Sequence, residues 1–140
     1  MSIFCGSCAA DMNGKEKIVF KTKYFERVFE VGSKGFVTTS FKALPSGNGL
    51  FTAETENEGT VTFNGAQYVI GGEGSAFKYS SHKFIEDEGG KRLEVVFVSG
   101  KPLPAGVELK IIYENPADTA VLTKWVLIHN NSDFAVYLNG

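Results

Sequence analysis

The sequence is poor in the residues that build metal and redox sites: two cysteines and two histidines occur among 140 residues. Cys5 and Cys8 form a C-x-x-C pair, but a zinc site would need two further ligands, and His82 and His129 lie in distant segments. A redox dithiol would be expected at the start of a helix in a βαβ unit, which the sequence lacks. We therefore expect no metal and no cofactor, and we interpret the pair as thiols on a flexible N-terminal arm, residues 1–15.

An excess of charge of one sign is also missing, because 14 Lys and Arg face 16 Asp and Glu, for a formal net charge of −2. This balance indicates neither a nucleic-acid footprint nor a polybasic membrane patch. The N-terminal stretch MSIFCGSCAADMNGKEK has no basic region and only a short apolar run, so it resembles neither a signal peptide nor a membrane span. We expect a cytoplasmic protein with no nucleic-acid or membrane partner.

Helical periodicity is absent, whereas aromatic residues reach 13% of the chain. Apolar residues alternate at period two, and turn signals recur about every eight to twelve residues, which is typical of all-β proteins. The clearest local signal is Asn64-Gly65 between two β-type runs, which predicts a two-residue type I′ hairpin. We predict an all-β protein, an antiparallel β-sandwich of about ten strands, in one domain over residues 16–140.

The other strands are expected where β-branched and aromatic residues alternate with polar ones. In the second of them, Phe25, Arg27 and Phe29 would share a face. The expected ranges are 17–22, 24–31, 36–43, 50–55, 77–85, 92–98, 107–113, 120–129 and 134–138.

Two acidic clusters and one Ser-Ser-His run are the only candidates for hydrolytic chemistry. The clusters are Glu54, Glu56 and Glu58, and Glu86, Asp87 and Glu88. Paired carboxylates can hydrolyse glycosides, but these lie beside Gly or Asn in expected turns, where we predict solvated charges. Ser81 and His82 would point to opposite faces of a strand, and no nucleophile elbow surrounds Ser80. We expect no catalytic residue in this chain.

The run LTKWVLIHNN has bulky apolar residues on both faces of its expected strand. Thr123, Trp125 and His129 would lie on the same face, with Leu127 between them. Such a strand is covered by protein on both sides, or its second face meets a partner. Burial alone explains a large aromatic residue. The alternative is that Trp125, with Thr123 and His129, offers a platform to a sugar or forms an interface.

Several stretches in the range 24–140 resemble a known family when taken in order. They are YFERVFEVGSKGFVTTSF, GTVTFNGAQYVIGG, FKYSSHKFIEDEGGKRLEVVFV and PLPAGVELKIIYENPADTAVLTKWVLIHNNSDFAVYLNG. In the last stretch, the matching positions are Leu109, Tyr113, Lys124, Asn130 and Leu138. The series resembles the N-terminal β-supersandwich domain of the family 36 glycoside hydrolases, which include α-galactosidases and raffinose-synthase-like enzymes.

The resemblance implies a non-catalytic domain that supports a catalytic barrel, its sugar pocket and oligomer contacts. Catalysis in that family is carried out by two aspartates of a (β/α)₈ barrel in a retaining mechanism, and no barrel occurs in this sequence. The family's supersandwich also continues beyond the last strand found here. We therefore expect the front portion of a longer protein, missing a C-terminal catalytic region, or a stand-alone relative that closes its sheet as a homo-oligomer. A stand-alone carbohydrate-binding module for a galactoside is the alternative.

Overall fold

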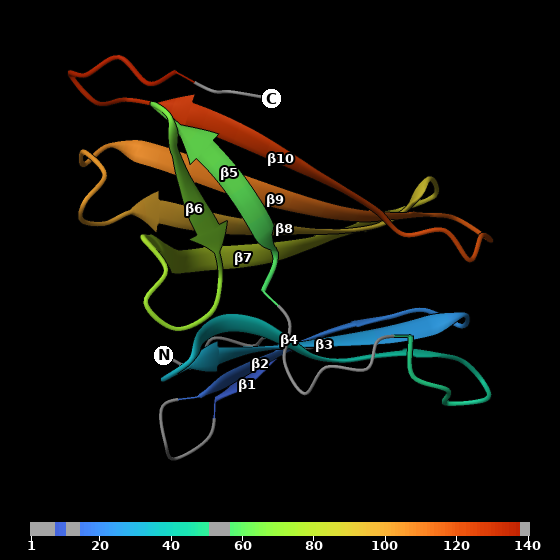
Figure 1. Ribbon diagram of the computed structural model, residues 1–140. Helices are drawn as coiled ribbons and strands as arrows, with labels where there is room; N and C mark the ends of the chain where they lie inside the picture. Colours follow the sequence, from blue (N-terminus) through green and yellow to red (C-terminus); the bar gives the residue numbers. More distant parts are fainter. Residues whose placement is uncertain (1–7, 11–14, 51–56, 138–140) are drawn as a thin grey trace, which may run out of the picture. The chain divides into compact units, whose positions relative to one another are not determined.

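The computed structural model describes residues 8–10, 15–50 and 57–137, and within these ranges it contains ten β-strands and no helix (Figure 1). The strands form two separate sheets, of four and six strands. The all-β class predicted from the sequence is therefore confirmed, and the sheets are consistent with a β-sandwich-like fold. The part of the chain that the structure describes also contains no helix long and apolar enough to cross a membrane.

The chain divides into two compact units, where the sequence had indicated a single domain. The first unit comprises Met1–Glu58 and Gly72–Gly74, and the second comprises Gly59–Gly71 and Ser75–Gly140. Each unit contains one of the two sheets. Because a glycine-rich turn of the second half of the chain belongs to the first unit, no single boundary in the sequence separates the two.

The first sheet is antiparallel throughout and has the strand order β1-β2-β3-β4. Its strands are β1 (Cys8–Ala10), β2 (Glu16–Lys21), β3 (Phe25–Gly32) and β4 (Gly35–Ala43). Cys8–Ala10 falls in the segment expected to be a flexible arm, and it pairs with β2 instead. Aromatic side chains fill the buried face of this sheet, where the rings of Phe29 and Phe36 stack with centroids 5.2 Å apart.

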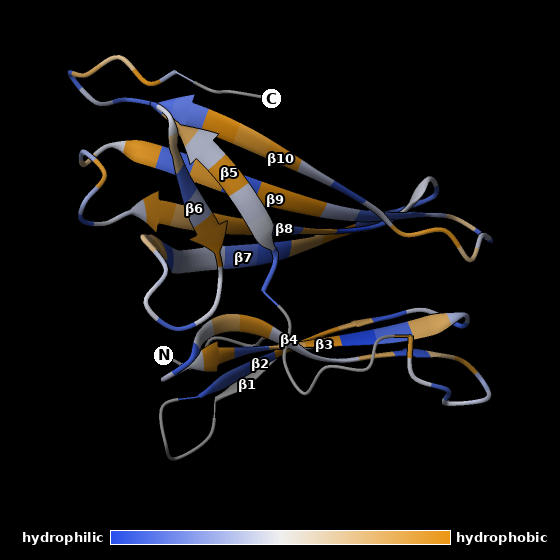
Figure 2. Cartoon of the chain, in the orientation of Figure 1, coloured by the Kyte–Doolittle hydropathy of each residue, from blue (hydrophilic) through white to orange (hydrophobic). Residues whose placement is uncertain are grey.

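The second sheet has the order β10-β9-β8-β7-β6-β5 and is antiparallel except for one parallel bridge between β6 and β7. Its strands are β5 (Gly59–Phe63), β6 (Ala66–Ile70), β7 (Phe77–Asp87), β8 (Gly90–Ser99), β9 (Val107–Pro116) and β10 (Thr123–Asn130). Figure 2 shows apolar and polar residues alternating along several of them. The apolar set is fully buried on two adjacent internal strands, where it consists of Leu93, Val95 and Phe97 on β8 and Leu109, Ile111 and Tyr113 on β9.

The Asn64-Gly65 hairpin is confirmed. Phe63 pairs with Ala66 across the turn, which leaves two residues in the loop. Asn64 has φ 49° and Gly65 has φ 81°, and positive φ at both positions defines a type I′ turn.

The prediction of a strand over residues 134–138 is wrong for its described part, since residues 134–137 form no ladder; Leu138 lies outside the described residues. The side chain of Asn130 donates to the Phe134 carbonyl and accepts from the Ser132 amide, which bends the chain after β10. Tyr137 then exchanges two hydrogen bonds with Asn64, at 2.8 and 2.9 Å. The expected strand over residues 50–55 lies almost wholly outside the described residues.

Candidate binding face of the second sheet

The three candidate site residues lie on β10, at the edge of the six-stranded sheet. β10 pairs with β9 and with no other described strand. Every residue of β10 except Ile128 is exposed, and Trp125 has 52% of its surface accessible. The expectation that a second layer of protein covers this strand on both sides is therefore wrong for the described residues. The apolar groups around Trp125 meet solvent because the strand lies at an edge.

The pairing register identifies the residues of the neighbouring strands that lie on the same face as Trp125, over four strands in all. Leu93, Val95 and Phe97 of β8 point into the core, so the residues between them point to the opposite, outer face. Three rows of cross-strand neighbours follow on the outer face. They are Ile85, Arg92, Glu114 and Thr123; Lys83, Glu94, Ile112 and Trp125; and Ser81, Val96, Lys110 and Leu127.

Charged pairs hold the polar part of this outer face in place. Arg92 Nη2 lies 3.4 Å from Glu114 Oε2, and Lys110 Nζ lies 3.1 Å from Glu94 Oε1. The Thr123 hydroxyl donates to the Glu114 carbonyl at 3.2 Å. Glu114 and Lys110 are on the strand next to Trp125, and Arg92 and Glu94 are on the following strand, with neighbouring strands about 4.8 Å apart. The indole ring therefore lies beside groups that can donate and accept hydrogen bonds.

A pocket of about 230 Å³ opens at the end of this face. It is lined by Ile85, Asp87, Gly89, Gly90, Lys91, Arg92 and Glu114. Gly90 has φ 135°, and a Cβ at this position would approach the Asn115 carbonyl oxygen to 2.1 Å, so the pocket's turn requires glycine. The row that contains Arg92 and Glu114 thus joins the surface beside Trp125 to a concave site.

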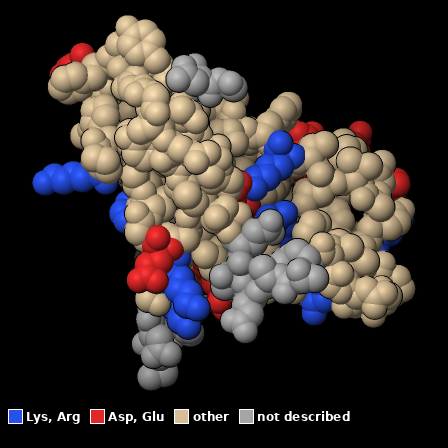
Figure 3. Space-filling model, in the orientation of Figure 1, with Lys and Arg blue, Asp and Glu red and all other residues tan. Residues whose placement is uncertain are grey.

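On the face that Figure 3 draws, described side chains of both charge signs are interspersed around a broad uncharged area. His129, the third candidate, is exposed on β10 and pairs with Glu108, two residues beyond Leu127. It lies away from the pocket, so Thr123 and Trp125 are the candidates that the structure places near it.

No contact described for Ser80, Ser81 or His82 pairs a serine hydroxyl with the imidazole as nucleophile and base. A bulge between Tyr79 and Ser81 shifts the strand's alternation, and it brings Tyr79 and His82 to the same face. The Tyr79 hydroxyl lies 2.7 Å from His82 Nδ1. The bulge was not predicted, because Ser80 and Ser81 read as ordinary strand residues.

The acidic cluster Glu86, Asp87 and Glu88 is exposed, as predicted, but Glu86 and Asp87 end β7 and only Glu88 lies in the turn. Glu54 and Glu56 lie outside the described residues. In the described ranges, no group of three or more His, Cys, Asp or Glu side chains could hold a metal ion. Cys5 and the Cys8 side chain lie outside what the structure describes, so the C-x-x-C interpretation stays a prediction.

Comparison with known proteins found no match. This holds for protein-family models, for curated proteins and for solved structures alike. The resemblance to the family 36 supersandwich therefore rests on the sequence stretches alone and remains a prediction.

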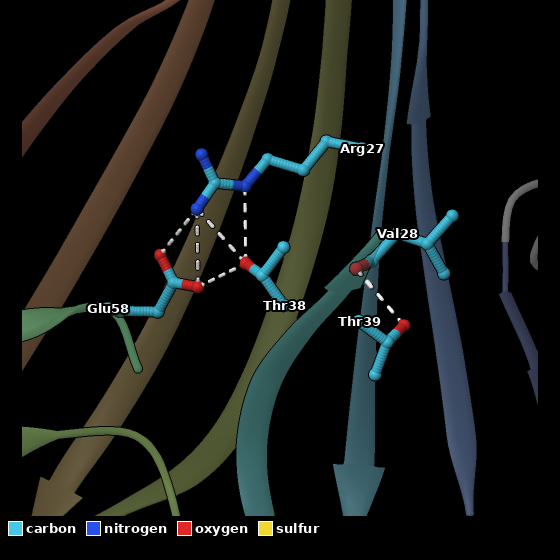
Figure 4. A network of polar contacts seen from close by, with 5 residues as sticks. All are labelled: Arg27, Val28, Thr38, Thr39 and Glu58. Atoms are coloured by element: carbon cyan, nitrogen blue, oxygen red, sulfur yellow. Dashed lines mark hydrogen bonds and ion pairs between the residues drawn. The ribbon is translucent and has the colours of Figure 1, made fainter. Parts of the chain in front are cut away.

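A buried polar cluster of the first unit was not predicted from the sequence. The prediction that Glu58 is a solvated turn residue is wrong: it is 4% exposed and faces Arg27 (Figure 4). Thr38 completes the cluster, accepting from Arg27 Nε at 3.2 Å and donating to Glu58 Oε1 at 2.5 Å. One signal was available, since Arg27 alternates with Phe25 and Phe29 on a core-facing strand.

Proposed function

We propose that this chain is a non-catalytic carbohydrate-recognition domain whose ligand lies on the outer face of β9 and β10. The observation that carries the proposal is the exposure of Trp125 beside a fixed row of polar groups. An indole ring offers a flat apolar surface to the C–H face of a pyranose, and ring hydroxyls need donors and acceptors at its rim. Thr123, Glu114 and Arg92 supply these groups.

The adjoining pocket supports recognition of a sugar end. It lies next to the polar row and is closed by the Gly89-Gly90 turn, with the side chains of Asp87, Arg92 and Glu114 in its lining. Carboxylates and a guanidinium bind vicinal hydroxyls through charge-assisted hydrogen bonds. A terminal sugar in the pocket would leave the next unit of an oligosaccharide over Trp125.

The test is calorimetric titration of the purified chain with galactose, glucose, mannose and a galactose-terminated oligosaccharide. We expect the oligosaccharide to bind more tightly than the monosaccharides, and Trp125→Ala to weaken binding by about tenfold or more. Phe134→Ala is the matched control, because Phe134 is an aromatic residue of 67% exposure in the segment after β10. Absence of heat with every sugar, or equal binding by Trp125→Ala, would overturn the proposal.

A second candidate is an accessory portion of an α-galactosidase-like glycoside hydrolase, favoured by the ordered stretches that resemble that family. In this case the outer face would contact the catalytic region or border its sugar pocket. The test is the DNA sequence downstream of the codon for Gly140. A continuing frame with alternating strands and helices and two barrel aspartates supports this candidate, and a stop codon there overturns it.

A further inference from the structure

The free edge of β10 differs from the edges of the other described strands. Its pairing with β9 continues over eight residues from Thr123 to Asn130 without a register shift. It contains no proline and no carboxylate, and Lys124 is its one lysine. Trp125, Val126 and Leu127 are three consecutive exposed apolar residues. Long, regular and apolar edges invite pairing with another strand, and proteins ordinarily protect them.

The edge of the first sheet at β4 shows such protection. The Gly72 amide donates to the Phe36 carbonyl at 2.9 Å near one end of β4. Near the other end, Lys42 bridges to Gly49, and the Leu50 amide donates to the Phe41 carbonyl at 2.7 Å. A bulge between these ends interrupts the strand's register with β3. The two remaining edges among the described strands are shorter, with five residues in β5 and three in β1.

We propose that β10 pairs antiparallel with β10 of a second copy of this chain. The strand is complementary to itself when a two-fold axis passes through Leu127. Trp125 then opposes His129 and Val126 opposes Ile128, which are aromatic and β-branched pairs of the kind that stabilise sheets. Lys124 opposes Asn130, so no like charges face each other. A basic partner strand would find no complementary charge on β10 and an acidic one would find only Lys124, which favours a second copy.

Pairing at the edge leaves both faces of the sheet accessible. The two six-stranded sheets become continuous, and the outer face of one copy continues into the outer face of the other. The two Trp125 side chains would then lie on the same side, four residues apart in register, or about 14 Å along the strands. The inference does not depend on sugar binding, although two adjacent platforms would raise the avidity for an extended glycan.

The first test measures the mass of the wild-type chain in solution by light scattering after size exclusion, over a dilution series. We expect a dimer that Val126→Lys converts to a monomer, because a lysine on an edge strand opposes edge-to-edge pairing and the change removes the β-branched pair with Ile128. Val98→Lys is the matched control, since Val98 is a similarly exposed valine, 42% against 40%, on the internal strand β8. It should remain dimeric. A monomeric wild type at every concentration overturns the proposal.

A disulfide cross-link tests the same pairing independently if Val126→Lys does not fold. With Cys5 and Cys8 replaced by serine, Leu127→Cys places one thiol on the two-fold axis, where directly opposed Cβ atoms are about 4.5–5.5 Å apart. A small adjustment brings them to disulfide distance, so mild oxidation should link two copies. Val98→Cys in the same background should stay unlinked. Equal linking of both variants, or linking of neither, overturns the proposed register.

Discussion

Arg27 Nη2 and Glu58 Oε2 lie 3.2 Å apart in the first unit, with 10% and 0% of the two side chains exposed. The guanidinium also lies 5.2 Å from the ring centre of Phe29 and 5.0 Å from that of Phe41. An ion pair buried among aromatic rings contributes little net stability, because both charges lose their hydration. Removing one partner is strongly destabilising, since the remaining charge stays buried without its counter-charge.

Glu58→Gln is therefore expected to destabilise the first unit by about 3–5 kcal/mol, although it keeps the size of the side chain. Urea denaturation followed by circular dichroism measures the change. Glu86→Gln is the control, because Glu86 is exposed on β7 and should change stability by less than about 0.5 kcal/mol. Equal effects of the two variants would show that Glu58 is solvated, as its sequence context suggests.

Thr38 is expected to be the group that orients this ion pair. Its hydroxyl is fully buried and bonds to both charged partners, so Thr38→Val removes these bonds without changing the shape of the side chain. The expected loss is about 1–3 kcal/mol by the same denaturation measurement. Thr39→Val is the matched control on the next residue, whose hydroxyl makes a longer bond of 3.4 Å to the Val28 carbonyl. A larger loss from Thr39→Val would contradict this assignment.

Local patterns predicted the strands well because alternation and turn chemistry act over a few residues. The hairpin at Asn64-Gly65 and the strand predicted over residues 92–98, which lies within β8, are examples. The partner of Arg27 could not be predicted in this way, because Glu58 lies 31 residues away and its neighbours favour a polar turn. Sequence alternation also placed Thr123 and Trp125 on one face, but it could not show that β10 lies at an edge. That property depends on which strands pair.

The type I′ turn gives a further test, located in the second unit. Gly65 has φ 81°, where a side chain is strained, so Gly65→Ala should destabilise this unit by about 1 kcal/mol. Thermal unfolding measures the effect. Gly100→Ala is the control in the same unit, because a Cβ there would meet its nearest atom at an ordinary 3.4 Å. Equal melting temperatures of the two variants would contradict the assignment of a strained position to Gly65.

Trp125 is the only tryptophan in the sequence, so its fluorescence reports on the binding face directly. Because 52% of the Trp125 surface is exposed, the fluorescence of the native protein should peak at a wavelength close to that of the unfolded chain. Acrylamide should quench the native emission strongly, because the indole ring is reachable from solvent.

Edge pairing of β10 should leave this quenching nearly unchanged, because the indole lies on the sheet face and the new hydrogen bonds form at the strand edge. Acrylamide quenching of Trp125 should therefore be nearly the same in Val126→Lys and in the control Val98→Lys. A blue-shifted emission that acrylamide does not quench would show that Trp125 is covered in solution. The outer face would then be a protein interface, and the accessory-domain candidate would replace sugar recognition as the better account of this chain.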